Sequence, residues 1–493
     1  MKYDYDIMVI GGGAAGLTAS GMAASLGARA ALVESEKLGG DCTWHGCIPS
    51  KTLLKSAAVY RSMNTAGRYG FRDVSPYFEF ENVLRHVRET QQHLYEDADK
   101  PEIYEEMGVH VLRAHAKFLD KHTVELFKNG VAPEKVTSKY FVIATGSVPR
   151  VPEIPGLKET KFYTNETIFA IDFLPEKLAV IGAGPIGIEL AQAFKRFGSD
   201  VVVIDSGERI LQHDDAELAQ LLKKELHNEG IEFFLKMHVS MVGEFGKRKR
   251  VFLKTAENPV PKIIECDAIL VATGRKANID SLNLQAAGVK FTEKGVTIDK
   301  SCQTNVSNIY ACGDVTGGLQ FTHVAEHHAK IAISNVILKL PLKTNDIIPW
   351  VTYTAPEVAH VGMTEKVLKE KGKDYEVYRF PFTKIDRAIT DGKTAGLIKV
   401  FAKSRSGKIY GATILGEHAG EMIAEYGLAI KHGISLKQIA DTIHAYPTYA
   451  LGNRRAADQW YIQKQSPLLV KVLKKLFGYR GQVPKKPGKH TII

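Results

Sequence analysis

A strand, a glycine-rich turn, a helix and a second strand that ends in an acidic residue occur twice in this sequence. This repeat constrains the fold more than any other feature. The first copy comprises the run DIMVI, the turn GGGAAG at 11–16, and the run AALV closed by Glu34. The second copy comprises the run KLAVI, the turn GAGPIG at 182–187, and the run VVVI closed by Asp205. The acid lies 18 positions after the last glycine of the turn in each copy, Gly16 and Gly187.

The glycines of each turn have distinct tasks in a dinucleotide site. Gly11 permits a tight turn, Gly13 lets the backbone approach a pyrophosphate, and Gly16 lets the helix pack against the strand. Glu34 is placed to accept hydrogen bonds from the ribose hydroxyls. The corresponding residues of the second copy are Gly182, Gly184, Gly187 and Asp205. One such turn is weak evidence, whereas two with matched strands and acids predict an α/β protein that binds two dinucleotides.

Two cysteines follow the first turn, in the segment GGDCTWHGCIPSK. Cys42 and Cys47 beside a dinucleotide site are typical of a redox-active disulfide. An undistorted helix would hold Cα atoms five residues apart at ~8 Å, beyond the ~7 Å limit for a disulfide. We therefore predict a bend at Gly46 and Pro49. Lys51 follows Cys47 by one helical turn and would favour its thiolate. The alternative is two unrelated buried cysteines.

Composition limits the class of protein. With 493 residues, 44% of them apolar, we expect about three domains with buried cores. Only five cysteines occur, and Cys266, Cys302 and Cys312 are isolated in the sequence. This usage is typical of a reducing compartment, so we expect a cytoplasmic protein. Cys312 lies beside a cofactor-type motif, but a small buried residue is the simpler interpretation. No resident metal is predicted.

The uncharged run 7–28 is long enough to be mistaken for a signal peptide or a membrane span. Asp4 and Asp6 precede it where a signal peptide would carry positive charge, and glycines interrupt it. We therefore interpret it as a strand, a tight turn and a buried helix.

Further motifs show a resemblance to a known family. They are ATG at 144–146, ATGR at 272–275, IYACGDV at 309–315, APEVA at 355–359 and VGMTE at 361–365. With the paired glycine turns and the cysteine segment, they resemble the pyridine nucleotide–disulfide oxidoreductases, in particular the mercuric reductase-like and dihydrolipoyl dehydrogenase-like members. The resemblance covers roughly residues 5–465.

The resemblance implies an α/β architecture of two Rossmann-like domains and an α+β C-terminal dimerisation domain in a homodimer. FAD would bind residues 1–157 and 280–346, NAD(P) would bind 158–279, and dimerisation would use 347–465. The implied FAD contacts are Gly11, Gly13, Ala15, Gly16, Glu34, Gly40, Thr145, Gly146 and Asp314, the last holding the ribityl chain. The implied nicotinamide-nucleotide contacts are Gly182, Gly184, Gly187, Asp205 and Gly274.

Asp205 also bears on which nicotinamide nucleotide is used. A carboxylate at this position pairs with a free 2′-hydroxyl and repels a 2′-phosphate, which favours NAD(H). Arg209 lies four residues further on, so NADP(H) stays open.

The resemblance also implies an electron path. NADH would reduce the flavin, and the flavin would open the Cys42–Cys47 disulfide. Cys47 would contact the flavin as its charge-transfer partner, and Cys42 would exchange with the substrate. Glu189 matches the acid that pairs with the lysine at the position of Lys51, and such a buried pair requires both partners.

The chain departs from the family pattern near its C-terminus. Disulfide reductases of the family carry His-Pro-Thr with a glutamate three residues later, where this chain has Tyr446 and Leu451. A phenol with a pKa near ~10 is a poor proton shuttle at neutral pH, which argues against turnover of dihydrolipoamide or glutathione disulfide. His444, offset by two residues, is either a replacement base or a structural histidine.

Tyr446 resembles a tyrosine of mercuric reductases that helps to handle the metal, and it would reach the cysteines of the partner subunit. Those enzymes also end in a vicinal cysteine pair that delivers the metal, whereas no cysteine follows Cys312 here. Asp41 and Trp44 replace the common Thr and Asn around the cysteines, which indicates an altered pocket.

We therefore predict an FAD enzyme that oxidises NADH or NADPH and reduces a small thiol-reactive acceptor. The acceptor would be a metal ion such as Hg(II), a disulfide or a quinone-like molecule. One alternative is dihydrolipoyl dehydrogenase, against which Tyr446 and Leu451 count. Another is a flavin-bearing, membrane-associated partner protein without turnover.

The C-terminal segment 466–493 concentrates positive charge. This segment contains seven cationic residues and no acidic one, so it accounts for most of the net charge of +10. The positive charge is therefore local, which argues against a nucleic-acid binder with basic residues spread over its surface. Ser466 can cap and Pro467 can start a helix that ends before Gly478. One face would carry Leu469, Val472, Leu473 and Leu476, and another Lys471, Lys474 and Lys475. Such a helix predicts peripheral contact with an anionic membrane; the alternatives are a solvated tail or packing on its own dimer.

Overall fold

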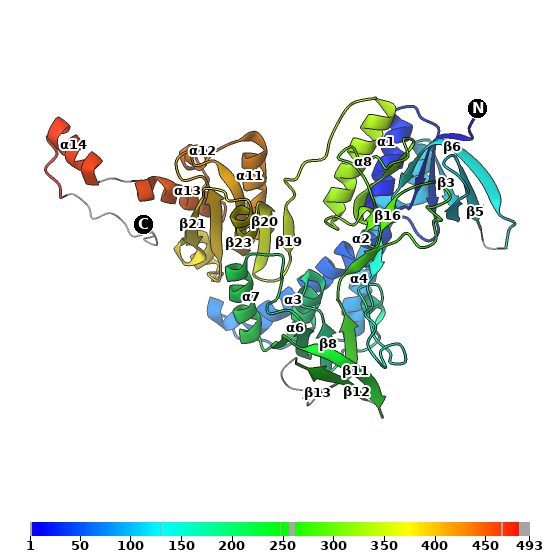
Figure 1. The fold of residues 1–493 in the computed structure, drawn as a ribbon. Helices are drawn as coiled ribbons and strands as arrows, with labels where there is room; N and C mark the ends of the chain where they lie inside the picture. The colour runs from blue at the N-terminus through cyan, green and yellow to red at the C-terminus, as the bar shows by residue number, and fades with distance from the viewer. Residues whose placement is uncertain (1, 129, 247, 256–261, 465–466, 483–493) are drawn as a thin grey trace. The chain divides into compact units, whose positions relative to one another are not determined.

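The computed structural model describes residues 2–128, 130–246, 248–255, 262–464 and 467–482. The chain forms two compact units, Met1–Ser206 with Ile231–Asn345 and Gly207–Gly230 with Asp346–Ile493. The boundary after Asn345 lies one residue from the predicted start of the dimerisation domain. Both predicted nucleotide-binding domains share the first unit, apart from 207–230, and the boundaries between them stay a prediction. Parallel sheets flanked by helices confirm the predicted α/β class (Figure 1).

A mainly parallel sheet forms the centre of the first unit. Its strand order is β3-β2-β1-β6-β18, and β5 and β4 extend β6 as an antiparallel meander. The strands are β1 Tyr5–Ile10, β2 Ala30–Glu34, β3 Val109–Arg113, β4 His115–Phe118, β5 Thr123–Phe127, β6 Glu134–Ile143 and β18 Ile309–Ala311. The register aligns Ile10 with Val33 and Ile143, so the carboxyl ends of the strands meet at one edge.

Strand β1 is buried on both faces. Ile7 and Val9 join one apolar cluster, and Met8 joins another on the opposite side of the sheet. Helices α1 (Ala14–Ser25) and α8 (Thr322–Ile337) pack side by side over the first cluster (Figure 1). The uncharged N-terminal run is thus a strand, a turn and a helix, as predicted. In the described part of the chain, no helix is long and apolar enough to span a membrane.

Short elements complete this part of the unit. The helices are α2 Gly40–Trp44, α3 Cys47–Asn64, α4 Phe80–Leu94 and α5 Pro101–Glu106, with a π-helical turn at Tyr95–Asp99 and 3₁₀ turns at Ala66–Tyr69, Ile168–Ala170 and Gly313–Thr316. The strands are β7 Ser147–Pro149, β15 Arg275–Ala277, β16 Phe291–Thr292 and β17 Gly295–Val296. His45 and Gly46 lie between α2 and α3, so the helix is interrupted at Gly46 as predicted, whereas Pro49 lies in the first turn of α3.

The second glycine turn belongs to a smaller parallel sheet of the same unit, with the order β10-β9-β8-β14. These strands are β8 Lys177–Ile181, β9 Asp200–Asp205, β10 Glu232–Leu235 and β14 Ala268–Val271. Helix α6 (Pro185–Phe197) packs on β8 and β9. An antiparallel meander joins β11 His238–Phe245, β12 Arg248–Lys254 and β13 Lys262–Cys266.

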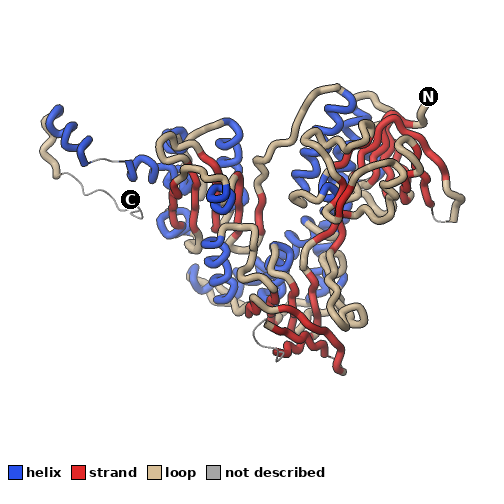
Figure 2. Tube along the Cα trace, in the orientation of Figure 1, coloured by secondary structure: helices blue, strands red, loops and turns tan. Residues whose placement is uncertain are grey.

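The second unit is built on an antiparallel sheet with the order β19-β20-β23-β22-β21 (Figure 2). Its strands are β19 Trp350–Thr352, β20 Glu357–Gly362, β21 Glu376–Pro381, β22 Leu397–Ala402 and β23 Ile409–Gly416. Its helices are α7 Ala216–Asn228, α9 Glu365–Glu370, α10 Asp386–Thr390, α11 Ala419–His432, α12 Leu436–Asp441, α13 Leu451–Lys464 and α14 Pro467–Phe477, with a 3₁₀ turn at Phe382–Lys384. The sheet, α11, α12 and α13 share one apolar core.

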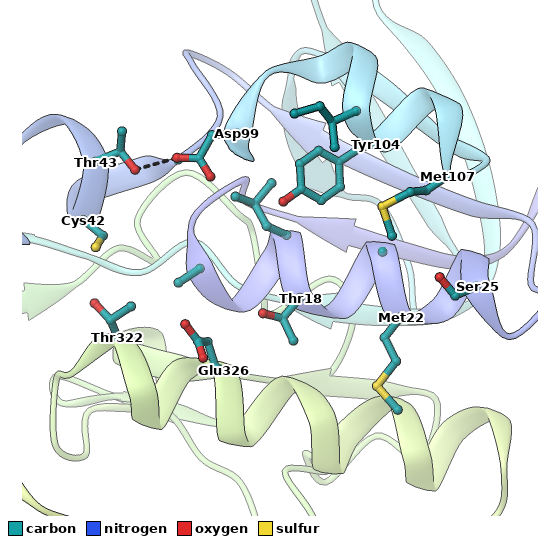
Figure 3. Close-up of a pocket in the computed structure, with 15 residues that line it drawn as sticks. Thr18, Met22, Ser25, Cys42, Thr43, Asp99, Tyr104, Met107, Thr322 and Glu326 are labelled. Carbon is teal, nitrogen blue, oxygen red and sulfur yellow. Dashed lines mark hydrogen bonds between the residues drawn. The ribbon is translucent and has the colours of Figure 1, made fainter. Parts of the chain in front are cut away.

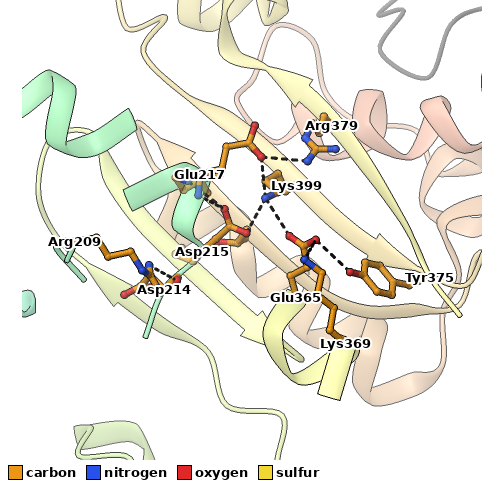
Figure 4. A network of polar contacts seen from close by, with 12 residues as sticks. Arg209, Asp214, Asp215, Glu217, Glu365, Lys369, Tyr375, Arg379 and Lys399 are labelled. Carbon is orange, nitrogen blue, oxygen red and sulfur yellow. Dashed lines mark hydrogen bonds and ion pairs between the residues drawn. The ribbon is translucent and has the colours of Figure 1, made fainter. Parts of the chain in front are cut away.

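A buried ion cluster ties α7 to this sheet (Figure 4). Lys399 on β22 is only 2% exposed, and its Nζ lies 2.7 Å from Asp215 Oδ2, 2.9 Å from Glu217 Oε2 and 3.8 Å from Glu365 Oε2. Asp215 also caps α7, because its Oδ1 accepts hydrogen bonds from the N–H groups of Glu217 and Leu218. A buried cation is tolerated only with such counter-charges.

Candidate active site

Cys42 and Cys47 come together where the chain bends between α2 and α3. Gly46 permits the close return, because a Cβ there would lie 2.8 Å from Asp41 Oδ2 and 3.0 Å from the Asp41 carbonyl oxygen. Both thiols are free, and they hydrogen-bond to each other. The predicted pair is therefore assembled within a single short segment.

The pKa values of the two thiols are shifted in opposite directions. The hydrogen bond with Cys42 lowers the pKa of Cys47 to about 6, helped by Thr322 and by the charge of Lys51, while burial opposes the shift. The same thiol–thiol bond, together with burial, raises the pKa of Cys42 well above its usual value. At neutral pH, Cys47 is thus the thiolate and Cys42 keeps its proton.

Lys51 and Glu189 form the predicted ion pair. Lys51 lies one turn after Cys47 on α3, and its Nζ is 2.9 Å from Glu189 Oε2 on α6. The Glu189 side chain is only 6% exposed. The packing of α3 against α6 therefore brings the predicted acid next to the cysteine helix.

The first glycine turn has the geometry that a pyrophosphate needs. Gly11 has a φ of 107°, and a Cβ there would lie 2.4 Å from the Ala144 carbonyl oxygen; a Cβ on Gly16 would lie 1.7 Å from the Gly11 carbonyl oxygen. Gly13 is different, because a Cβ would meet nothing closer than Gly40 Cα at 3.8 Å. Two glycines thus allow the backbone to pack, and the third leaves space for a ligand.

The acidic residues that end β2 and β9 each accept a hydrogen bond from a backbone N–H of the neighbouring glycine turn. Glu34 Oε2 accepts the N–H of Gly12 at 2.6 Å, and Asp205 Oδ2 accepts the N–H of Ala183 at 2.7 Å. The second turn also repeats the packing of the first. A Cβ on Gly187 would lie 2.1 Å from the Gly182 carbonyl oxygen, whereas a Cβ on Gly184 would meet nothing within 4 Å.

The other predicted FAD contacts lie at the edge of the first sheet or beside it. Thr145 and Gly146 follow β6, and Thr145 Oγ1 donates to the Asn278 carbonyl oxygen at 2.7 Å. Gly40 lies against Gly13, whereas the Ala15 side chain is buried in the core next to Gly313. Gly274, a predicted nicotinamide-nucleotide contact, follows β14 of the smaller parallel sheet with a φ of 113°. The site fits FAD, since the open backbone at Gly13 would face the phosphates and polar groups line the strand ends.

A hydrogen-bonded chain connects Asp314 with the cysteine segment. Burial raises the pKa of Asp314, and the hydroxyl of Ser147, which donates to Asp314 Oδ2 at 2.6 Å, opposes that shift. Arg275 donates to Ser147 Oγ at 2.7 Å and pairs with Asp41 Oδ1 at 3.0 Å. Asp41, the neighbour of Cys42, is therefore fixed by contacts that sequence reasoning did not identify.

Tyr446 and His444 lie in the second unit. Tyr446 is 69% exposed. His444 has both ring nitrogens engaged, Nε2 with Glu425 Oε1 at 2.9 Å and Nδ1 with the Thr442 carbonyl oxygen at 3.0 Å. Leu451 is buried at the start of α13. The catalytic roles of Tyr446 and His444 stay predictions.

A cavity of about 620 Å³ opens beside Cys42 (Figure 3). Its walls come from α1, α5, the cysteine segment and the start of α8. Thr322, which opens α8, lies 3.5 Å from Cys47 and was not identified from the sequence. No local pattern signals it, because 275 residues separate the two.

The remaining cysteines and the tail are as the sequence indicates. Cys266, Cys302 and Cys312 are buried, and Cys312 hydrogen-bonds with Cys302. Helix α14 has no buried residue among those described, and Gly478 follows it with a φ of 68°. Ser466, the predicted cap, lies outside the described residues.

Comparisons with known proteins match nearly the whole chain. A family model described as pyridine nucleotide-disulphide oxidoreductase matches residues 5–329, and the dimerisation domain of that family matches residues 348–456. A mercuric reductase from Staphylococcus aureus is 35% identical over 465 residues, covering 92% of this chain and 82% of the relative. A dihydrolipoyl dehydrogenase from Bacillus subtilis is 33% identical over 460 residues, covering 91% and 96%.

A solved structure gives the same result. The Cu(II) complex of the HOCl-induced flavoprotein disulfide reductase RclA from Escherichia coli superposes with a TM-score of 0.83 at 26% identity, covering 93% of this chain and 99% of that one. Both glycine turns and both cysteines fall within the first matched family region. This chain belongs to the pyridine nucleotide-disulphide oxidoreductases, enzymes that bind FAD, use a pyridine nucleotide and carry a disulfide redox centre.

Proposed function

We propose that this enzyme oxidises NAD(P)H and uses Cys42 and Cys47 to reduce a small thiol-reactive acceptor, either a metal ion or a disulfide. The observation that carries the proposal is the asymmetric thiol pair: Cys47 is held as a thiolate, and protonated Cys42 lines a cavity. Bound FAD supplies the two-electron chemistry between the nicotinamide and the sulfur pair. With a disulfide, NAD(P)H, H⁺ and RSSR give NAD(P)⁺ and two RSH; with Hg(II), NAD(P)H gives NAD(P)⁺, Hg(0) and H⁺.

The protonation of Cys42 favours a metal ion over a disulfide. Thiol–disulfide exchange needs a thiolate. Because the pKa of Cys42 is raised, Cys42 stays protonated unless a base removes its proton. The exchange histidine of the family is replaced by Tyr446, and His444 is already bonded to Glu425. A thiophilic metal ion displaces the thiol proton on binding and needs no such base. The mercuric reductase among the relatives supports the same choice.

Dihydrolipoyl dehydrogenase is the second candidate function, favoured by the relative from Bacillus subtilis. It requires efficient exchange between Cys42 and a dithiol, for which Tyr446 is poorly suited. A panel of acceptors decides between them: Hg(II), Cu(II), lipoamide, glutathione disulfide and a quinone, each with NADH and NADPH. Faster turnover of lipoamide than of the metal ions would overturn the metal-ion proposal, and no reduction by either nucleotide would support a role without turnover.

We propose NADH as the preferred nucleotide. The Ala183 N–H donates a hydrogen bond to the Asp205 carboxylate and fixes its orientation. The negative charge of this carboxylate would repel the 2′-phosphate of NADPH. The guanidinium donors of Arg209 are engaged by the carbonyl oxygens of Leu211, Gln212 and Asp214. The dimerisation domain supports a homodimer as the working state.

We also propose that α14 attaches this otherwise cytoplasmic enzyme to an anionic membrane surface. The large apolar side chains of the helix are exposed, and its cations complement anionic lipid headgroups. The exposed apolar residues are Leu468, Leu469, Val472, Leu473, Leu476 and Phe477. Sedimentation with phosphatidylserine vesicles tests this attachment.

A further inference from the structure

Asp41 brings a negative charge into the cysteine segment, at a position where a threonine is common in the family. It directly precedes Cys42 and lies in the short helix α2. One of its oxygens is turned toward the bend before Cys47, because a Cβ on Gly46 would lie only 2.8 Å from Asp41 Oδ2. A carboxylate therefore lies beside the backbone that joins the two thiols.

The other oxygen of this carboxylate is held by two side chains from distant parts of the sequence. Arg275 on β15 lies 3.0 Å from Asp41 Oδ1, and Asn165 Nδ2 donates to the same oxygen at 3.3 Å. Asn165 also donates to the carbonyl oxygen of His45, the residue that ends α2, at 3.4 Å. Arg275 is fixed in turn, because it donates to Ser147 Oγ at 2.7 Å and to the Ser147 carbonyl oxygen at 2.8 Å. The position of the Asp41 charge is thus set by the surrounding fold.

The cysteine segment and the helix that follows it carry two ion pairs of opposite polarity. In the first pair the cation belongs to the cysteine helix, since Lys51 on α3 pairs with Glu189 on α6. In the second pair the anion belongs to the cysteine segment, since Asp41 pairs with Arg275. The sulfur atoms therefore lie between a positive and a negative side chain of their own segment.

The charge of Asp41 disfavours the thiolate form of both cysteines. The hydrogen bond with Cys42 is the main cause of the low pKa of Cys47, and the charge of Lys51 contributes, whereas burial and the charge of Asp41 oppose the shift. At Cys42, the hydrogen bond with Cys47, burial and the charge of Asp41 all raise the pKa. The cause of the Asp41 effect is repulsion between like charges.

We propose that Asp41 is a positioning residue that tunes the reducing strength of the disulfide centre. Reduction breaks the Cys42–Cys47 sulfur–sulfur bond with two electrons and one proton, which NAD(P)H supplies through FAD, and leaves a thiol on Cys42 and a thiolate on Cys47. The Asp41 carboxylate repels the new negative charge, so the reduced pair is less stable and gives its electrons to an acceptor more readily. The inference goes beyond the proposed function, because it concerns the redox centre and holds for any acceptor.

The test compares the FAD-loaded parent with Asp41→Asn, which keeps an oxygen for Arg275 and Asn165 but removes the charge. Each enzyme is equilibrated in dithiothreitol redox buffers, and the reduced fraction of the Cys42–Cys47 pair is measured by alkylation and mass spectrometry. We expect the equilibrium constant for reduction to rise about fivefold, which corresponds to ~20 mV in the potential of a two-electron couple. An unchanged potential would overturn the inference.

The pH dependence of Cys47 alkylation gives a second readout. We expect the proton affinity of the Cys47 thiolate to fall about fivefold in Asp41→Asn, so that the thiolate persists to a lower pH than in the parent. Glu166, which interacts electrostatically with His45, Arg275 and Asp41, is present in both enzymes, so its titration is common to the two profiles. A purely structural disturbance would not change the potential and the proton affinity by the same factor. Shifts of opposite sign would contradict the role of charge.

Two further variants separate charge from shape. Asp41→Thr removes the same charge with a different side chain, so it should shift the potential in the same direction as Asp41→Asn. Lys51→Met should shift it in the opposite direction, and Asp41→Asn/Lys51→Met should lie between the two single variants. A potential that moves the same way in Asp41→Asn and Lys51→Met would refute an electrostatic effect.

Asp280→Asn is the matched control. It removes a carboxylate that pairs with Lys276, the neighbour of Arg275, at 3.0 Å but lies outside the cysteine segment. We expect the potential to stay at the parental value, and a shift as large as that of Asp41→Asn would refute a specific role of Asp41. Neither readout requires turnover. Failure of NAD(P)H to reduce any acceptor would therefore count against the proposed function and not against this inference.

Discussion

Thr322 Oγ1 lies 3.5 Å from Cys47 Sγ, and each residue opens a helix at the same site. The hydroxyl contributes to holding the pKa of Cys47 at about 6, next after the hydrogen bond with Cys42. A contact between two helix starts, α3 and α8, thus helps to keep the sulfur ionised.

Thr322→Val is expected to raise the pKa of Cys47 by about one unit, since a hydrogen bond to a charged group is worth about 1.5 kcal/mol. The thiolate is present above the pKa and is lost as the pH falls through it, so the variant should lose reactivity at a higher pH than the parent, in which the loss occurs near pH 6. The pH dependence of Cys47 alkylation in the dithiol enzyme measures this. Thr52→Val is the control, because Thr52 bonds only to its own helix; identical profiles for Thr322→Val and parent would contradict the assignment.

Gly184→Ala and Gly187→Ala should behave differently. A Cβ at Gly184 meets nothing within 4 Å, so the fold should persist while the Kd for NADH rises about tenfold or more. A Cβ at Gly187 would collide with the Gly182 carbonyl oxygen, so this variant should be destabilised. Thermal unfolding and NADH titration separate the two effects, and normal NADH binding by folded Gly184→Ala would refute the location of the nucleotide site.

Asp205→Asn keeps an oxygen that accepts the Ala183 N–H but removes the negative charge. We expect the preference for NADH over NADPH to fall about tenfold, with little change in kcat/KM for NADH itself. Steady-state kinetics with both nucleotides give the ratio. A parent enzyme that prefers NADPH would contradict the assigned role of Asp205.

Lys51→Met removes the cation from a nearly buried carboxylate. We expect a loss of stability of about 1–3 kcal/mol and a higher pKa for Cys47. Lys51→Met/Glu189→Leu should recover stability but not the Cys47 pKa, because only the stability depends on a carboxylate that has lost the Lys51 cation. Thermal unfolding and alkylation profiles of the two variants provide the comparison; recovery of both properties would rule out an effect of Lys51 on the thiol.

Deletion of residues 466–493 should abolish sedimentation with phosphatidylserine vesicles and leave NADH-dependent turnover in solution unchanged. Lys471→Glu/Lys474→Glu/Lys475→Glu should weaken binding in the same direction, while high salt should weaken binding of the parent. Equal sedimentation of the full-length and truncated enzymes would exclude this helix as the attachment.

Local patterns were sufficient to predict the glycine turns, their acids and the cysteine bend, because each depends on residues close in sequence. The Lys51–Glu189 pair was predicted only through the family resemblance, since the two residues are 138 positions apart in the sequence. The contacts of Thr322 and Arg275 could not be predicted, because they depend on how helices and strands pack rather than on spacing. The cavity is a similar case: Met22 lies on α1 and Met107 follows α5, and only the folded chain makes both line one cavity with Cys42.

The position of α7 has a consequence for dissecting the enzyme. Asp215 and Glu217 precede the predicted dimerisation domain by more than a hundred residues, yet both neutralise Lys399 inside its sheet. An isolated fragment that starts at residue 347 would retain Glu365 but enclose an ammonium group that has lost its two nearest carboxylates. Separate expression of that fragment should give an unstable product unless Lys399 is replaced by an apolar side chain.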